Sequence, residues 1–185
     1  MSRQSLPEQI GEYLRLGLTL IPLKPCSKEP LVKWGNDWEP TPGELVRWTA
    51  QPGINWAVRC GPELAVLDFD NADAFPSFLQ AHPEAGSWPR VRTGRGYHIW
   101  VKPKGSIPSQ RHNGLEVKCL GSYVVAPPSI HPNGTPYTFE VAPDGTLPEV
   151  ELERLLGLGE IDSLPKLPRY ESIRNAAPSD FALRY

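Results

Sequence analysis

Prolines and glycines interrupt this sequence so often that they leave little room for long helices or long strands. The 185 residues include 22 prolines and 16 glycines, spread between hydrophobic runs rather than gathered into one repeat. Both residue types favour turns, and proline also removes a backbone donor. The hydrophobic share of 39% is still enough to build a core. We therefore predict one compact domain of short elements joined by defined turns.

Hydrophobic periodicity and turn residues predict an α+β protein. Two helices are expected near the N-terminus, from Ser5 to about Leu16 and from Thr41 to about Ala50, each opening on a capping box. Further helices are expected at 72–81 and 148–156, with short strands at 18–21, 56–59, 64–70, 90–93, 97–102, 115–118, 123–126 and 137–139. Residues 157–185 lack periodicity and predict a tail, or a linker to a possible C-terminal domain.

The strongest chemical signal is an apolar run that ends in two acidic residues. Residues 64–67 lead into Asp68-Phe69-Asp70, and because strand side chains alternate, both carboxylates point to one face. Adjacent carboxylates repel each other unless a hard divalent cation lies between them, which predicts a Mg²⁺ or Mn²⁺ site. A helix cap at Asp70 and an exposed Asp68 would explain the motif equally well.

A second charged strand, Leu115-Glu116-Val117-Lys118, alternates in the same way. If it lies beside the first strand, Glu116 completes a site of three carboxylates and Lys118 can neutralise a triphosphate. The alternative is an ordinary polar strand face, which the pattern by itself favours.

A glycine-containing turn, Thr93-Gly94-Arg95-Gly96, leads into the strand that holds His98. The two glycines let backbone amides approach an anion closely, and Arg95 supplies charge for phosphate oxygens. Alternation lets His98 share the polar face with the carboxylates and donate to a phosphate, although a purely structural histidine is the alternative.

The segment 121–134 combines a β-branched strand, a double proline and an Asn-Gly turn. This pattern is typical of a segment with a structural role.

The net charge of -2 excludes nucleic-acid binding through bulk charge, so a basic surface must be local. Lys28, Lys33 and Trp34 lie in a proline-rich loop and could touch a single-stranded template, because charge and stacking together hold such strands. Packing of the tryptophan within the fold is the alternative. The sequence lacks a signal peptide and an apolar run of membrane length, which predicts a soluble cytoplasmic protein without a membrane partner.

Taken in order, these motifs resemble the bifunctional primase/polymerase (prim-pol) family of the archaeo-eukaryotic primase superfamily. The likeness runs from about Leu16 to Phe139. Its first piece is the run from Gly17 to Leu23 together with Lys28-Glu29-Pro30 and Trp34. The later pieces are Leu67-Asp68-Phe69-Asp70, Thr93-Gly94-Arg95-Gly96-Tyr97-His98, Glu116-Val117-Lys118 and the run from Tyr123 to Ser129. It implies that Asp68, Asp70 and Glu116 bind two divalent ions, with Glu116 standing where many relatives have Asp. It implies that His98 contacts the phosphates of the incoming nucleotide, beside Arg95 and Lys118.

The resemblance also implies an RRM-like antiparallel catalytic sheet at about 61–156 and a small N-terminal α/β module at about 1–60. The implied activity is a template-dependent DNA primase/polymerase that serves DNA replication. Its substrates would be dNTPs or NTPs, its partners a primed single-stranded DNA and a possible helicase, and its state a monomer. A two-metal nuclease or phosphoesterase is one alternative, and a non-catalytic module that binds single strands is another. Only a polymerase requires a triphosphate and releases pyrophosphate.

Overall fold

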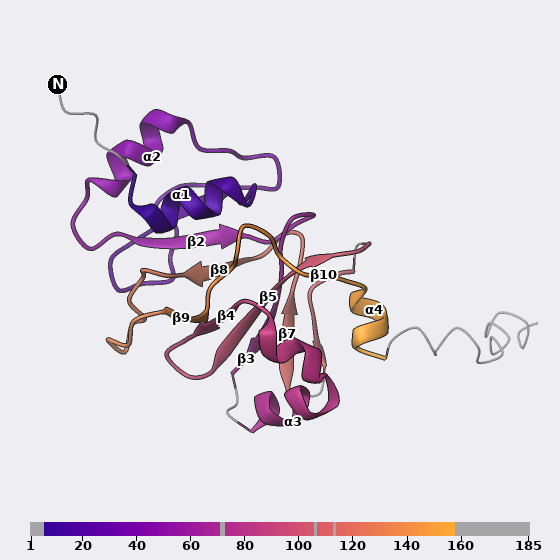
Figure 1. Cartoon of the computed structure of the whole chain (residues 1–185). Helices are drawn as coiled ribbons and strands as arrows, with labels where there is room; N and C mark the ends of the chain where they lie inside the picture. The colour runs from indigo at the N-terminus through magenta and orange to yellow at the C-terminus, as the bar shows by residue number, and fades with distance from the viewer. Residues whose placement is uncertain (1–5, 71–72, 106, 113, 158–185) are drawn as a thin grey trace, which may run out of the picture.

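The computed structural model describes residues 6–70, 73–105, 107–112 and 114–157. Within them the chain forms two antiparallel sheets and a small number of short helices (Figure 1). This arrangement confirms the α+β class that the sequence predicts.

The smaller sheet combines strands from distant parts of the chain. It has three strands in the order β1-β2-β8, namely β1 (Leu20–Leu23), β2 (Asn55–Arg59) and β8 (Tyr123–Ala126). Two helices, α1 (Glu8–Arg15) and α2 (Pro42–Thr49), lie next to it (Figure 1). Because β8 pairs with β2, a strand from the later part of the chain completes a sheet whose other two strands lie near the N-terminus.

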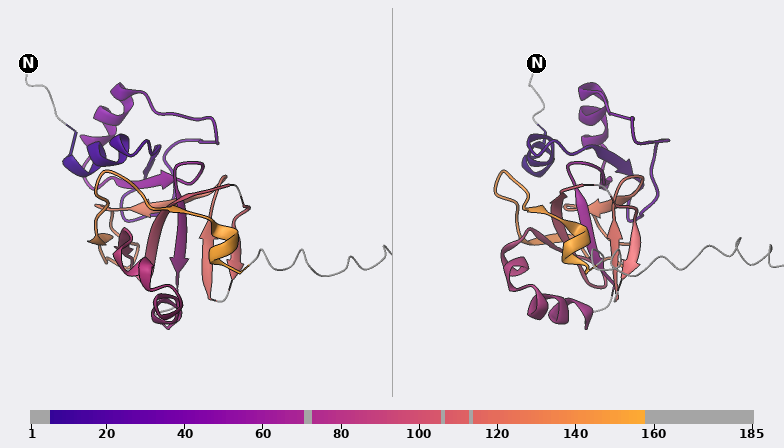
Figure 2. Two further views of the ribbon diagram at one scale, coloured as in Figure 1. Left: turned by 45° about the vertical axis from the view of Figure 1, so that its right-hand side comes forward. Right: turned by 90° about the vertical axis from the view of Figure 1, so that its right-hand side faces the viewer.

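The larger sheet has seven strands, and six of them follow the order β6-β7-β3-β5-β4-β9 with antiparallel pairing throughout. They are β3 (Ala65–Phe69), β4 (Arg90–Arg92), β5 (Tyr97–Pro103), β6 (Gln110–His112), β7 (Leu115–Lys118) and β9 (Thr138–Val141). The seventh, β10 (Glu149–Val150), pairs in parallel with the end of β5. The helices α3 (Ala74–Ala81) and α4 (Leu152–Leu155) and a 3-10 turn (Pro83–Ser87) accompany this sheet, and Figure 2 shows α3 at the end far from α1 and α2.

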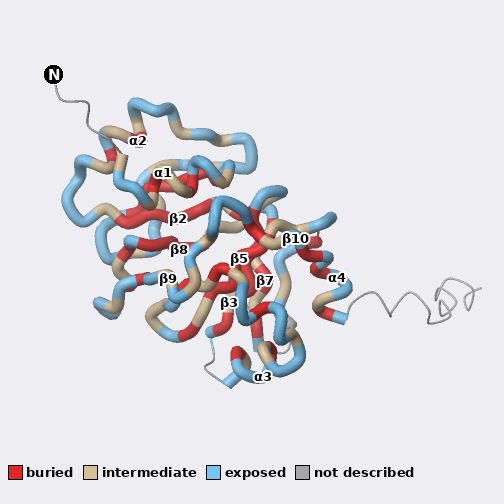
Figure 3. Tube along the Cα trace, viewed as in Figure 1, coloured by how far each residue is buried: buried red, intermediate tan, exposed pale blue. Residues whose placement is uncertain are grey.

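Alternation along the strands produces two hydrophobic clusters, one on each face of the larger sheet. Leu67 and Phe69 of β3 pack with the phenylalanines of α3 on one face. Val66 and Trp100 belong to the other cluster, which the small sheet and α1 complete. Figure 3 shows the central strands as largely buried and the connecting loops as exposed. The side chain of residue 68, which shares a face with Val66, is therefore directed toward the small sheet.

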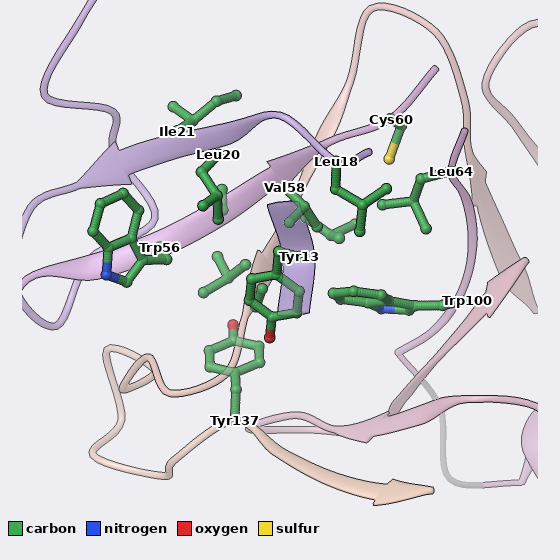
Figure 4. Close-up of a cluster of buried hydrophobic side chains, with 14 of the residues drawn as sticks. Tyr13, Leu18, Leu20, Ile21, Trp56, Val58, Cys60, Leu64, Trp100 and Tyr137 are labelled. Atoms are coloured by element: carbon green, nitrogen blue, oxygen red, sulfur yellow. The ribbon is translucent and has the colours of Figure 1, made fainter. Parts of the chain in front are cut away.

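Tyr13 of α1 joins the two sheets at the centre of the second cluster. Its ring centroid lies 5.6 Å from that of Trp100 on β5, and Figure 4 shows the two rings side by side among Leu18, Leu20 and Val58. Its hydroxyl donates a 2.7 Å hydrogen bond to the buried carbonyl of Pro127. Burial raises the pKa of Tyr13 far above its ordinary value, so the hydroxyl keeps its proton and remains a donor.

Most elements lie within a few residues of the positions predicted from the sequence, and the differences have local causes. The capping box at Thr41 is confirmed, because its side chain and that of Glu44 exchange hydrogen bonds with each other's backbone N–H. The first helix instead begins after Pro7 without a side-chain cap, and Ser5 lies outside the described residues. Strand β6 was not predicted, because Gln110-Arg111-His112 carries no apolar alternation.

The predicted helix at 148–156 is wrong in its first half. Glu149 and Val150 form β10, and the helix α4 starts only at Leu152. The reason is the tertiary pairing with β5: the Lys102 N–H donates to the Pro148 carbonyl and the Lys104 N–H to the Val150 carbonyl. Propensity alone does not reveal such a pairing.

Removing the Tyr13 hydroxyl should weaken the contact between the sheets. We expect Tyr13→Phe to lower the free energy of unfolding by about 1–2 kcal/mol, because the Pro127 carbonyl would stay buried without its donor. Urea unfolding followed by circular dichroism measures the change. Tyr123→Phe is the matched control and should cost less, because its hydroxyl bonds the carbonyl of the exposed residue Lys28. Equal losses in both variants would contradict this role for Tyr13.

Candidate active site

The candidate site forms where β3 ends. Asp68 is half-buried on the face that looks toward the small sheet, and Asp70 follows directly after the strand. Between them, Phe69 is buried on the opposite face and contacts Phe75 and Phe78 of α3. Anchoring Phe69 in the core leaves both carboxylates at the surface of the other face, as the sequence predicts.

The two neighbouring strands bring further polar side chains to Asp68. In the register of the sheet, Asp68 lies opposite Glu116 of β7 and opposite His98 of β5. Residues paired directly across antiparallel strands point to the same face. Glu116, Asp68 and His98 therefore form a row across three strands. The strand of Glu116 thus lies beside the strand of Asp68, which a site of three carboxylates requires.

The three carboxylates converge closely enough to share a metal ion. One oxygen each from Asp68, Asp70 and Glu116 lies within 4.8 Å of the other two. Carboxylate oxygens are the ligands that hard divalent cations such as Mg²⁺ and Mn²⁺ prefer. The donor set fits a Mg²⁺ or Mn²⁺ ion.

Cationic and hydrogen-bonding groups offset this negative charge. Lys118 Nζ lies 2.7 Å from Glu116 Oε1, and Arg111 lies 3.6 Å from the other oxygen of that carboxylate. His98 Nε2 lies 3.4 Å from Asp68 Oδ1. Cations therefore contact Glu116, and an imidazole contacts Asp68.

The pKa of Asp68 reflects these neighbours. Burial raises the pKa of this carboxyl, but the hydrogen bond and the charge of His98 lower it. The charges of Lys118 and Lys28 lower it further, and the result is a pKa below the ordinary value. The Asp68 carboxyl is thus ionised at neutral pH, as a metal ligand must be.

His98 is buried, and its second ring nitrogen points away from the carboxylate. Nδ1 is enclosed and has no hydrogen-bond partner in the part of the chain that the structure describes. Nε2 is therefore the ring nitrogen that can donate to the Asp68 carboxylate, 3.4 Å away.

The turn at residues 93–96 lies against the end of β3. Thr93 organises it, since its N–H donates to the Gly96 carbonyl and its hydroxyl accepts from the amides of Arg95 and Gly96. A Cβ atom on Gly96 would lie only 1.8 Å from the Phe69 carbonyl oxygen. Glycine is needed here for close backbone approach, which places the turn beside the carboxylates. Arg95 is exposed.

A second loop supports this turn, and the sequence did not point to it. The ring of His131 packs on Gly94, where a Cβ atom would come within 2.5 Å of it. Asn133 donates from its side chain to the Gly94 carbonyl and from its backbone to His131 Nδ1. The sequence pattern of residues 121–134 predicts only a structural role. The support that this loop gives to Gly94 depends on contacts between segments far apart in the sequence.

A pocket of about 410 Å³ opens beside the carboxylates, between the two sheets. Asp68, His98 and Lys118 line it from the larger sheet, and Tyr123 to Val125 line it from β8. Tyr137 also lines it, and the pKa of its hydroxyl is raised by burial first and by the charges of Asp68 and Asp70 second.

The three residues suggested for template contact differ in their relation to this pocket. Lys28 and Trp34 line the pocket, whereas Lys33 is exposed on the loop between them. A different pocket, of about 700 Å³, lies on the opposite face between α3 and α4 and has a mostly apolar lining. The polar pocket is the one that adjoins the carboxylates.

Fold and site together define the class of this protein: an α+β protein whose antiparallel sheet carries an acidic cluster suited to a divalent metal. Residues 11–167 match the model of the family described as bifunctional DNA primase/polymerase, N-terminal, and the chain belongs to that family. The resemblance seen in the sequence motifs is thereby confirmed. Membership indicates an enzyme of the primase/polymerase type.

Two further findings concern the chain as a whole. A search of curated proteins gave no match. Among the described residues, every helix is too short or too polar to cross a membrane.

Adding one methyl group at Gly96 should disrupt the end of β3. We expect Gly96→Ala to lower the free energy of unfolding by about 1–3 kcal/mol, because the new Cβ atom would collide with backbone rather than with a flexible side chain. Thermal or urea unfolding measures the loss. Gly86→Ala is the control and should change stability little, since a Cβ atom there would meet nothing within 4 Å beyond its chain neighbours. A Gly96→Ala protein as stable as the parent would contradict the close approach.

Removing one carboxylate should weaken metal binding without unfolding the protein. We expect Asp68→Asn to reduce Mn²⁺ affinity at least about tenfold, because affinity for a hard cation depends on the number of charged oxygen ligands. Titration followed by electron paramagnetic resonance of free Mn²⁺ measures it without any assay of activity. Asp144→Asn, an exposed carboxylate beyond β9, should bind like the parent. Unchanged affinity in Asp68→Asn would exclude the cluster as the metal site.

Proposed function

We propose that this protein is a template-dependent nucleotidyltransferase, a DNA primase/polymerase that adds nucleotides to a primer 3′ end in DNA replication. One observation carries the proposal: in a chain of the primase/polymerase family, three carboxylates converge, and one of them, Asp68, lines a pocket together with basic side chains. Asp68, Asp70 and Glu116 would be the metal ligands and catalytic carboxylates. Either Mg²⁺ or Mn²⁺ suits them, with two ions in the complete site.

When bound, divalent ions at this site would activate the primer hydroxyl and stabilise charge on the triphosphate and on the leaving pyrophosphate. The protein's own part is positioning. Phe69 holds the two aspartates in place from the core, and His98 orients Asp68 through the Nε2 hydrogen bond. Such preorganisation matters because charge is stabilised without reorganisation during the reaction.

Phosphate binding would use the groups around the pocket. Lys118 lies at the edge of both the pocket and the carboxylate cluster. His98 lines the same wall. The turn Thr93-Gly94-Arg95-Gly96 would shape one side of the phosphate site and offer the exposed Arg95 side chain to phosphate oxygens. The incoming dNTP or NTP would thus lie between the turn and β7.

The order of strands supports an RRM-like catalytic sheet. Strands β3, β4, β5 and β7 lie in the order β7-β3-β5-β4, with α3 between β3 and β4. This is the arrangement of a β-α-β-β-α-β unit whose second helix is replaced, here by the short strand β6. The proposed N-terminal module spans about 1–60 and the proposed catalytic sheet about 61–156. A primed single-stranded DNA would be the partner. Primer initiation, a helicase partner and a monomeric state stay predictions.

Primer extension tests the proposal. With a labelled primer on a single-stranded template, Mn²⁺ or Mg²⁺ and either dNTPs or NTPs, we expect longer products together with release of pyrophosphate. Asp68→Ala and Glu116→Gln should each reduce the rate at least about a hundredfold, since each removes part of a site that contributes several kcal/mol. Asp144→Asn should extend like the parent. Shortening of the primer would instead establish a nuclease, and strand binding without any chemistry would establish a binding module.

A further inference from the structure

We propose that Lys28 and Trp34 bind the incoming nucleotide, with Lys28 contacting its phosphates and Trp34 its nucleoside part. This inference rests on the proposed function and assigns these two residues to binding of the nucleotide rather than of the template. It adds an N-terminal wall to a pocket whose other wall carries Asp68, His98 and Lys118.

The pocket has walls from two sheets. Asp68, His98 and Lys118 line it from the larger sheet, while Lys28 and Trp34 approach from the loop between β1 and α2. Its volume of about 410 Å³ is within the usual size of small-molecule sites. A ligand in this space would contact both walls at once.

The loop that carries Lys28 is held in place by its backbone. Leu23 and Pro30 form a bridge across its base, and the Lys24 N–H donates to the Glu29 carbonyl over 2.9 Å. At its tip, Asn55 of β2 donates from its side chain to the Ser27 carbonyl over 3.0 Å. The position of Lys28 is therefore set before any ligand arrives.

A second anchor ties the loop to the far side of the pocket. The Tyr123 hydroxyl of β8 donates a 2.9 Å hydrogen bond to the Lys28 carbonyl. This bond uses the carbonyl of Lys28 and leaves its ammonium group to other contacts. The neighbouring Glu29 carboxylate pairs with Lys24 at 2.6 Å, whereas Lys28 forms no ion pair with any residue that the structure describes.

Lys28 lines the same pocket as Lys118 and His98, from the opposite wall. Two lysines and an imidazole around one small pocket suit a ligand that carries several negative charges in a short span. A triphosphate has that charge density, whereas a template strand presents one charge per nucleotide along an extended backbone.

Trp34 supplies an aromatic surface to the same pocket. It is half-buried and meets Tyr123 edge to face, with ring centroids 5.2 Å apart and ring planes at 89°. This contact fixes the orientation of the indole. Aromatic faces stack on bases with little regard to sequence, which is what a polymerase needs from a surface that receives all nucleotides in turn.

Binding of nucleotide and of DNA can be measured separately. The probes are a deoxynucleoside triphosphate analogue that cannot be cleaved between the α and β phosphates, the matching monophosphate, and a fluorescent single-stranded oligonucleotide. Calorimetry in Mn²⁺ gives the first two affinities, and anisotropy gives the third. We expect Lys28→Ala to bind the triphosphate at least about tenfold more weakly and the monophosphate with a smaller loss, with DNA affinity unchanged.

Matched variants separate the roles. Lys33→Ala, a lysine of the same loop outside the pocket, should keep triphosphate affinity, and Lys28→Arg should restore most of what Lys28→Ala loses. Trp34→Phe should bind the triphosphate more tightly than Trp34→Leu, because it retains a stacking face. Thermal unfolding of each variant checks that the fold persists.

The outcomes are distinct. If the parent protein binds no triphosphate in Mn²⁺, the proposed function itself fails, and this inference with it. If the parent binds but Lys28→Ala binds equally well, the inference alone is overturned. It is also overturned if Lys28→Ala loses DNA affinity while keeping nucleotide affinity, since the residue would then serve the template.

Discussion

The pairing of β3 with β5 on one side and β7 on the other governs the chemistry of this protein. That register puts His98 and Glu116 beside Asp68, and a slip of β3 by one residue would turn Asp68 to the face opposite the other two. The register is held because Leu67, Phe69 and Val117 fill the opposite face. Burial of one face thus determines which polar groups meet on the other.

The small sheet matters to the site because it provides the second wall of the pocket. Strand β8 comes from the late part of the chain but pairs with β2, so it carries Tyr123 to the loop that holds Lys28. The hydrophobic cluster around Tyr13 and Trp100 keeps this sheet against the larger one. The distance between the walls therefore follows from packing far from the pocket itself.

Positive and hydrogen-bonding groups offset the negative charge of the carboxylate cluster. Lys118 and Arg111 lie against Glu116, and His98 lies against Asp68. These contacts counter the repulsion that would otherwise disfavour carboxylates so close together. Lys118 also lines the pocket, so the same amine can contact a carboxylate or a phosphate.

By itself, the sequence determined the α+β class, the family motifs and the residue types of the site, because side-chain period and turn chemistry depend on neighbouring residues. It did not predict β6, which has no apolar alternation, or β10, which exists only through its pairing with β5. Only the tertiary structure decided that β7 adjoins β3, that Lys28 rather than Lys33 lines the pocket, and that His131 and Asn133 support Gly94. The physical reason is sequence separation: contacts between strands and loops many residues apart depend on how whole sheets pack, and no local pattern encodes that packing.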